Sequence, residues 1–305
     1  MMNEPDLDAP LLSVVIPAYR RRESVLLLLA DLFRQRYRRF EVIVVEDCGG
    51  DGTYEAVMKL FPQVIILKND KNSGPTVSRN RGIRAAKGEI VVGLDSDVTV
   101  PDPDLLERVA ATFAELTEVV GLAFRILRPD GRSEDTPRWW HPVPIAAYAD
   151  KRFHTSYFCG TAFAFRRDSV LAAGLFPEIL YMYYEEVELS FRVLDLGGSI
   201  VHCPDLAVLH HASEIARRSD AQVFYEPRNQ ILVAAACFPA HHAFLYLVPR
   251  FFYRFSLAWR RGELPIFLRA MRSVADLLPK RLKERKPLRR QTLRRISDMR
   301  RGILA

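Results

Sequence analysis

Over the first hundred residues, short apolar segments rich in β-branched residues alternate with longer segments of helical pattern. The apolar segments are 11–17, 41–46, 63–68 and 89–95, and the helical ones are 24–35, 51–61 and 73–88. Strands without polar positions are buried on both faces, and strands that are joined through helices run parallel. The sequence therefore predicts an α/β fold in which helices flank a mostly parallel sheet.

The pattern is less regular after residue 100. Helices are predicted over 101–116, 168–173 and 181–198, and strands over 119–127, 158–166 and 199–211, the last of these broken into two at Pro204. From about Ser219 the pattern is helical to the C-terminus. We therefore expect an α/β domain over 1–218 and a helical region over 219–305.

Charge is divided unevenly along the chain. The net charge is +7, but residues 250–305 hold 17 Lys and Arg against 4 Asp and Glu, a net of +13, so the remaining residues sum to −6. A basic tail on an acidic body indicates a separate role for the tail.

Cysteine spacing and the N-terminal residues bear on the compartment. The four cysteines lie far apart without a CxxC pair, and the first ten residues are acidic and polar. These features argue against a disulfide scaffold, a cysteine zinc site and a secretory signal. They favour the cytoplasm.

Three C-terminal segments bear on membrane contact. Residues 231–248 carry no charge and reach the lower length limit of a membrane span, but Pro239 favours two packed or interfacial helices instead. Residues 244–278 mix aromatic, leucine and arginine side chains, which is typical of a helix in the headgroup plane. With the basic stretch 280–301, they predict peripheral attachment to an anionic surface, the inner face of the plasma membrane. The alternative is that the apolar part packs on the body of the protein.

Asp95, Ser96 and Asp97 follow the fourth predicted strand. Ligands of α/β sheets gather outside the carboxyl ends of the strands, and two carboxylates at this spacing can face one divalent cation and its phosphates. Asp and Ser are also common in turns and helix caps, so both interpretations stay open here.

Other polar residues stand at the ends of predicted elements. Glu46 ends the second strand, where a carboxylate can accept hydrogen bonds from a base or a ribose. Arg79 lies near the start of the third helix, and helix N-termini attract anions. His210 ends a strand, and an imidazole beside two aspartates suits Mn²⁺ or Mg²⁺, although a surface position is the common alternative.

Glu185, Glu186 and Glu188 lie within one turn of a predicted helix. Neighbouring helical residues point about 100° apart. Glu185 and Glu186 therefore cannot face each other across a glycosidic bond, as the paired carboxylates of a hydrolase do. One of them can point into a cleft as a base, and a solvated helix face is the alternative.

Taken in chain order, these segments resemble glycosyltransferase family 2, whose members have the Rossmann-like GT-A fold. The resemblance rests on SVVIPAYRR (13–21), VVEDCGGDGT (44–53), NSGPTVSRNRGIRAAKGEIVVGLDSD (72–97), GTAFAFRRDSVLAAGLFPE (160–178), YYEEVELSFRV (183–193) and AVLHHAS (207–213). The C-terminal arrangement is most similar to bacterial rhamnosyltransferases and related cell-surface polysaccharide transferases.

The resemblance implies a metal-dependent, inverting transfer of a sugar from a UDP-, dTDP- or GDP-sugar to a glycan or lipid-linked acceptor. The nucleotide sugar would bind mainly to 11–100 and the acceptor to 101–218. The residues implied for the nucleotide sugar are Pro17, Ala18, Tyr19, Glu46, Arg79, Asp95 and Ser96. Asp95, Asp97 and His210 are implied to hold Mg²⁺ or Mn²⁺, and Glu186 is implied to be the base, beside Glu185.

Three residues depart from the family pattern. Arg20 replaces a common asparagine, and Glu46 and Glu186 each replace an aspartate. The extra methylene shifts each carboxylate, but glutamate is chemically competent as a base.

Two other functions fit parts of the sequence. A nucleotidyltransferase that makes the sugar nucleotide shares the α/β architecture, but it needs a glycine-rich loop after the first strand, and PAYRRRES lacks one. A nucleic-acid binder could use the basic tail 280–301, but the tail has no aromatic residue for base stacking. We therefore expect no nucleic-acid partner.

Overall fold

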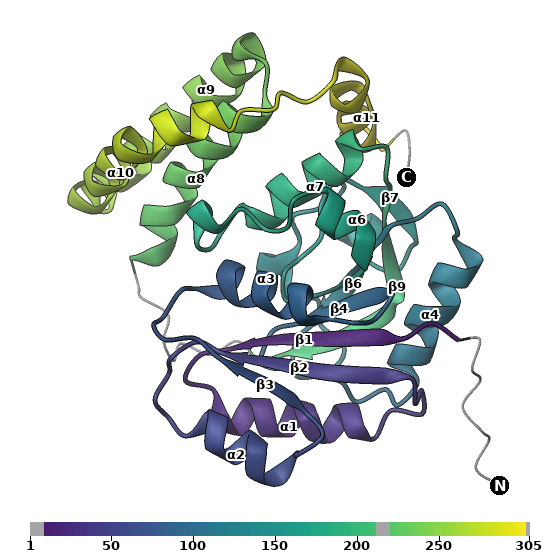
Figure 1. Ribbon diagram of the computed structural model, residues 1–305. Helices are drawn as coiled ribbons and strands as arrows, with labels where there is room; N and C mark the ends of the chain where they lie inside the picture. The colour runs from purple at the N-terminus through teal and green to yellow at the C-terminus, as the bar shows by residue number, and fades with distance from the viewer. Residues whose placement is uncertain (1–8, 212–219, 303–305) are drawn as a thin grey trace, which may run out of the picture.

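The computed structural model describes residues 9–211 and 220–302, and one mixed nine-stranded sheet organises this part of the chain (Figure 1). The strand order is β3-β2-β1-β4-β8-β6-β9-β5, and β7 pairs with β9. The strands are β1 (Leu12–Ala18), β2 (Phe40–Glu46), β3 (Ile65–Lys68), β4 (Ile90–Leu94), β5 (Val98–Thr99), β6 (Gly121–Leu127), β7 (Phe153–Thr155), β8 (Ala162–Arg166) and β9 (Ile200–His210). The first four are parallel, as predicted, whereas β8 runs antiparallel to β4 and β6.

Helices flank the sheet and bury both of its faces, which confirms the predicted α/β class. The helices are α1 (Arg22–Phe33), α2 (Thr53–Leu60), α3 (Pro75–Ala85), α4 (Leu105–Glu115), α5 (Ile145–Tyr148), α6 (Arg167–Ala172), α7 (Glu185–Asp195), α8 (Ala221–Cys237), α9 (Ala240–Arg260), α10 (Leu264–Lys283) and α11 (Arg290–Arg300), with short 3-10 turns η1 (Thr136–Arg138) and η2 (Glu178–Leu180). Val14 of β1 packs in one core with Leu28 of α1, and Val15 packs in another with Ile83 of α3. Successive strand side chains point to opposite faces, so an unbroken apolar strand needs a helix on each side.

β9 is one continuous strand, and the predicted break at Pro204 is wrong. Where β9 pairs with β6, Cys203 lies opposite Phe124, but the next residue of β6, Arg125, lies opposite Ala207. This irregularity accommodates Pro204, which has no N–H to donate, while the strand continues.

A turn that precedes α7 takes the place of the first turn of the predicted helix. Tyr181, Tyr183 and Tyr184 have φ of 66°, 66° and 70°. Residues other than glycine adopt such positive φ values only where the surrounding structure imposes them. Asn229 of α8 does so, because its amide donates to the carbonyl oxygens of Met182 and Tyr183, both at 2.7 Å. A contact distant in sequence thus overrides the local helical pattern.

Residues 231–248 are divided between α8 and α9. Pro239 directly precedes α9, where its missing N–H removes no helical hydrogen bond. Across the described residues, no helix combines the length and the apolarity needed to cross a membrane.

The C-terminal helices pack on the body of the protein through α7 and η2. Leu232 of α8 shares a core with Phe191 of α7. Arg281 of α10 forms a buried ion pair with Glu188 of α7, and Glu188 also lies 3.6 Å from Arg192 Nε. Each of these charges is taken out of water, so each depends on its partner.

We expect Arg281→Met to lower the free energy of unfolding by about 3 kcal/mol, because it leaves Glu188 buried with only Arg192 nearby. Urea denaturation measures the change. Lys280→Met, at an exposed position of the same helix, serves as the control and should change stability by less than about 0.5 kcal/mol. Equal losses in both variants would contradict a special role for the buried pair.

Candidate active site

Two adjoining cavities open near the carboxyl ends of β1, β2 and β4. The strand-end cavity has a volume of about 450 Å³ and the aromatic cavity about 680 Å³. Pro75, Asp95, Tyr181 and Met182 line both cavities. The two spaces are therefore parts of one cleft, with Asp95 at their junction.

Six of the residues predicted for the nucleotide and metal sites line the strand-end cavity. They are Pro17, Ala18, Tyr19, Asp95, Ser96 and Asp97. The loop before α3 forms another part of the wall, and Asp47 holds it by accepting hydrogen bonds from the N–H groups of Ser73 (2.9 Å) and Gly74 (2.8 Å). Gly74 has a φ of 87°, and a Cβ there would lie 2.4 Å from the Tyr181 ring, so only glycine fits.

Glu46 lines neither of these two cavities. It is 2% exposed, and its Oε1 accepts a hydrogen bond from the Gly49 N–H. Its Oε2 is buried and has no hydrogen-bond partner in the described part of the chain. Asp47, the next residue, reaches the cavity wall instead.

Asp97 meets His210 beside the strand-end cavity. His210 Nε2 lies 3.6 Å from Asp97 Oδ1, and His210 Nδ1–H donates to Asp135 Oδ2 at 2.6 Å. Because a carboxylate can only accept, Nδ1 carries a proton, and Nε2 is the ring nitrogen that faces Asp97. Arg21 Nη2 lies 3.6 Å from the other Asp97 oxygen. Arg21, the residue before α1, is distant from Asp97 in the sequence, so no cation was expected beside this aspartate from its sequence neighbours.

These residues fit a divalent cation in part. Among residues 9–211 and 220–302, no three His, Cys, Asp or Glu side chains are grouped closely enough to hold a metal by themselves. His210 Nε2, however, is buried without a hydrogen-bond partner in the described chain, and its ring is oriented by the Asp135 carboxylate. A carboxylate behind a histidine is a common support of a metal ligand. The donor set of Asp97 and His210 therefore suits a cation that takes its remaining ligands from phosphate.

Arg79 of α3 lines the aromatic cavity and bonds to Asp95, which lines both cavities. Its Nη2 donates to Asp95 Oδ1 at 2.7 Å and to the Gly160 carbonyl at 3.3 Å, and its Nη1 donates to Glu185 Oε1 at 3.3 Å. Burial alone would lower the pKa of Arg79, but the carboxylates of Asp95, Glu185 and Glu186 outweigh burial and raise it. Arg79 is thus a permanent cation held between carboxylates.

Glu185 and Glu186 begin α7 on the wall of the aromatic cavity. Burial, followed by the neighbouring Glu186 carboxylate, raises the pKa of Glu185 well above its ordinary value. Burial also raises the pKa of Glu186, and the Arg79 cation offsets this only in part. Glu186 is half-buried, and its Oε1 accepts a hydrogen bond from the Gly160 N–H at 3.2 Å. Glu185 is engaged with Arg79, whereas Glu186 is the more exposed of the two carboxylates.

Most of the aromatic cavity was not assigned from the sequence. Its further lining residues include Arg138, Trp140, Tyr157, Tyr184, Gln222, Tyr225 and Glu226. Trp140 lies 5.9 Å from the Tyr157 ring and 5.3 Å from the Tyr184 ring, and Tyr181 stacks on Tyr225. The concentration of tryptophan and proline after β6 was the available signal, but no pattern indicated that this loop and α8 would meet.

The family model described as "Glycosyl transferase family 2" matches residues 13–173. The succinoglycan biosynthesis protein ExoO of Rhizobium meliloti is 35% identical over 143 residues, which are 44% of this chain and 41% of that protein. The chain spans between 29% and 41% of the length of four such relatives, this one included.

Two other matches cover a larger share of the chain. The N-acetylglucosaminyl-diphospho-decaprenol L-rhamnosyltransferase of Mycobacterium tuberculosis is 26% identical over 243 residues, which cover 69% of this chain and 79% of that one. The solved mannosyltransferase PcManGT of Pyrobaculum calidifontis, in complex with GDP-Man and Mn²⁺, superposes with a TM-score of 0.60 at 20% identity and covers 99% of this chain and 87% of that one. The second match shows that the fold is GT-A.

Proposed function

The chain belongs to glycosyltransferase family 2, and we propose that it transfers a sugar from a nucleoside-diphosphate sugar to an acceptor hydroxyl with inversion at the anomeric carbon. One observation carries the proposal: Asp95 lines both cavities and bonds to the buried Arg79. Asp97 lines the cavity on one side of this junction, and Glu186 lines the cavity on the other. A donor bound across Asp95 would have its diphosphate near the aspartates and its sugar near the glutamates.

The strand-end cavity is the proposed site of the nucleotide, which would be a UDP-, dTDP- or GDP-derivative. Pro17, Ala18 and Tyr19 line it after β1, and Ser96 lines it after β4. A role for Glu46 in binding the base or ribose stays a prediction, and it requires the buried carboxylate to turn toward the cavity. The GDP-Man complex of PcManGT supports a nucleotide sugar in this fold.

We assign the divalent cation, Mg²⁺ or Mn²⁺, to Asp97 and His210, with Asp95 beside them. The cation would supply positive charge to the diphosphate leaving group. The Mn²⁺ of the PcManGT complex supports this assignment. Asp135 fixes the tautomer of His210 so that Nε2 stays available as a ligand.

Glu186 is the proposed base. As the acceptor oxygen attacks the anomeric carbon, the acceptor proton passes to Glu186, and the bond to the diphosphate breaks on the opposite side of that carbon. Burial raises the pKa of Glu186, which makes the carboxylate a better proton acceptor. Glu185 takes no part in this step, because Arg79 holds it.

The aromatic cavity is the proposed acceptor site, for a lipid-linked or polysaccharide glycan. Trp140, Tyr157 and Tyr225 present rings to it, and such rings have an apolar face that suits the carbon face of a sugar. The decaprenyl-linked substrate in the name of the mycobacterial relative supports a lipid-linked acceptor. We propose that 1–218 is the catalytic domain and that 219–305, through α8, completes the acceptor half of the site.

We further propose that α9 attaches the protein to the inner face of the plasma membrane. Leu245, Phe252 and Trp259 recur every seven residues, so they lie on one face of α9, and they are 68%, 65% and 63% exposed. Two arginines of α9 lie on other faces, since Arg254 pairs with the buried Glu226 and Arg250 stacks on Tyr246 at 3.8 Å. An exposed helix face of leucine and aromatic side chains suits contact with a lipid surface.

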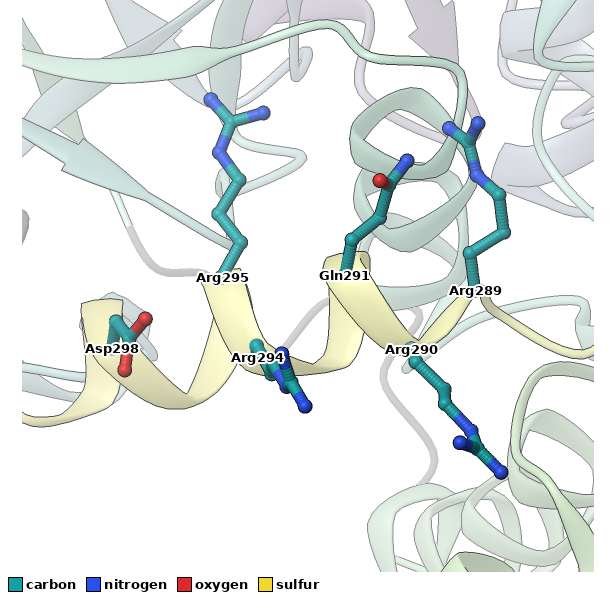
Figure 2. Close-up of a pocket in the computed structure, with 6 residues that line it drawn as sticks. All are labelled: Arg289, Arg290, Gln291, Arg294, Arg295 and Asp298. Atoms are coloured by element: carbon teal, nitrogen blue, oxygen red, sulfur yellow. The ribbon is translucent and has the colours of Figure 1, made fainter.

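Helix α11 adds positive charge to the same C-terminal region. Arg289 lies 3.6 Å from Asp195, and Arg295 donates to the Gly198 carbonyl at 2.7 Å. Figure 2 shows Arg290 and Arg294 projecting from the other side of the helix. Each basic side chain near an anionic leaflet contributes about 1 kcal/mol, so residues 250–305 with a net charge of +13 favour an anionic membrane over a second protein.

Asp97→Ala should abolish the Mn²⁺-dependent stabilisation by a nucleoside diphosphate while leaving the fold intact. A thermal-shift panel of UDP, dTDP and GDP, with Mn²⁺ and with EDTA, measures this and identifies the base. Asp150→Ala, an exposed aspartate outside both cavities, should bind as the wild type does. Retention of metal-dependent binding in Asp97→Ala would contradict the metal assignment.

Glu186→Gln should lower kcat by about 10²–10⁴-fold and leave donor binding unchanged, because the amide cannot take the proton. Release of nucleoside diphosphate from the donor found in the panel gives the rate. The wild-type rate should fall at low pH through a pKa above the ordinary glutamate value, and the variant should lose this dependence. A larger loss in Glu185→Gln than in Glu186→Gln would assign the base to Glu185.

Full-length protein should float with anionic liposomes at low salt and stay with the soluble fraction at high salt. Phe252→Ser with Trp259→Ser should prevent flotation without unfolding the protein, because both side chains are exposed. Leu27→Ser with Leu60→Ser removes equally exposed apolar side chains from α1 and α2 and should leave flotation unchanged. If the α9 pair floats like the wild type, attachment through α9 is refuted.

A further inference from the structure

Arg138 is a cation in the cleft that neither the nucleotide pocket nor the proposed base uses. It ends the turn η1 and lines the aromatic cavity, and its side chain is 25% exposed. Asp135, three residues before Arg138, bonds to His210, and His210 in turn lies beside Asp97. The local backbone is set by the bond from the Arg138 N–H to the Asp135 carbonyl at 2.8 Å.

The guanidinium of Arg138 is poorly satisfied by protein groups. Its Nε is buried and makes no hydrogen bond within the described residues, and the nearest carboxylate oxygen, Asp135 Oδ2, is 3.8 Å away. Burial alone would lower the pKa of Arg138, but the neighbouring Asp95 and Asp135 carboxylates help to raise it, so the side chain is charged. A buried N–H of a charged group that makes no hydrogen bond costs free energy, and a ligand that accepts this hydrogen bond would remove the cost.

The other arginines near the cleft already have partners. Arg79 is held by Asp95, Glu185 and the Gly160 carbonyl. Arg21 lies against Asp97, and Arg254 is paired with Glu226. Among these cations, Arg138 is therefore the one that lines the cleft with a guanidinium Nε that has no hydrogen-bond acceptor within the described residues.

We propose that Arg138 binds a diphosphate group in the cleft, and this inference rests on the proposed function. Guanidinium groups recognise phosphate through paired charge-assisted hydrogen bonds. The diphosphate has two possible sources, the donor and a lipid-diphosphate acceptor. If it belongs to the donor, the electron pair of the breaking bond between carbon and oxygen moves onto the phosphate oxygen, and Arg138 stabilises that charge while Glu186 holds the acceptor proton.

The test compares Arg138→Gln and Arg138→Lys with the wild type by calorimetric binding in the presence of Mn²⁺. The probes are the nucleoside diphosphate that stabilises the wild type, the same nucleoside without phosphate, and farnesyl diphosphate as a lipid diphosphate. Arg138→Gln should lower the affinity for a diphosphate probe by about 10- to 100-fold and leave the affinity for the bare nucleoside unchanged. Arg138→Lys should recover part of the loss, because it keeps the charge but not the planar donors. Arg132→Gln, at an exposed position of the same loop, should bind all probes like the wild type.

The pattern of loss identifies the source. A loss confined to the nucleoside diphosphate assigns Arg138 to the donor, and a loss confined to farnesyl diphosphate assigns it to the acceptor. Unchanged binding of both diphosphates by Arg138→Gln overturns the inference and leaves the proposed function standing, as does an equal loss for the bare nucleoside, which would show a structural role. A wild-type protein that binds none of the phosphates, with Mn²⁺ or without, overturns the proposed function as well.

Discussion

The buried guanidinium of Arg79 is the interaction on which the cleft depends. It binds Asp95 after β4, the Gly160 carbonyl before β8 and Glu185 at the start of α7, so three separate segments converge on one cation. The Glu185 carboxylate is buried, so it needs a fixed positive partner. The same contact keeps Asp95 at the junction of the two cavities. A Cβ at Gly160 would lie 2.8 Å from Arg79 Nη2 and 2.5 Å from Glu186 Oε1, so the close packing also requires a glycine there.

The C-terminal helices complete the cleft as well as covering the protein. Asn229 of α8 holds the tyrosine turn before α7 by donating to carbonyls at 2.7 Å, and this turn lines both cavities. Glu226 of α8 lines the aromatic cavity and pairs with Arg254 of α9. The helix with the exposed aromatic face is therefore connected through one ion pair to the wall of the proposed acceptor site. This arrangement suits an acceptor that arrives from a membrane surface.

The two halves of the cleft divide the charges that a transfer reaction requires. Asp97 and His210 form an oxygen and nitrogen donor set on one side, supported by Asp135. Glu186 lies on the other side, where burial raises its pKa, and Asp95 is ion-paired with Arg79. Such a separation lets one site hold anionic phosphates while the other accepts a proton.

The sequence by itself determined the α/β class, the parallel first half of the sheet, and the residues at the ends of β1 and β4, because strand burial and residue type act locally. It also indicated His210, Arg79 and the paired glutamates, through their resemblance to a family. Only the tertiary structure decided that β9 is continuous, that α7 begins at Glu185, and that Glu46 is buried and lines neither cavity. It alone brought Arg138 and Glu226 to the aromatic cavity. These features depend on contacts between segments far apart in the chain, where the packing of a neighbour outweighs local preference.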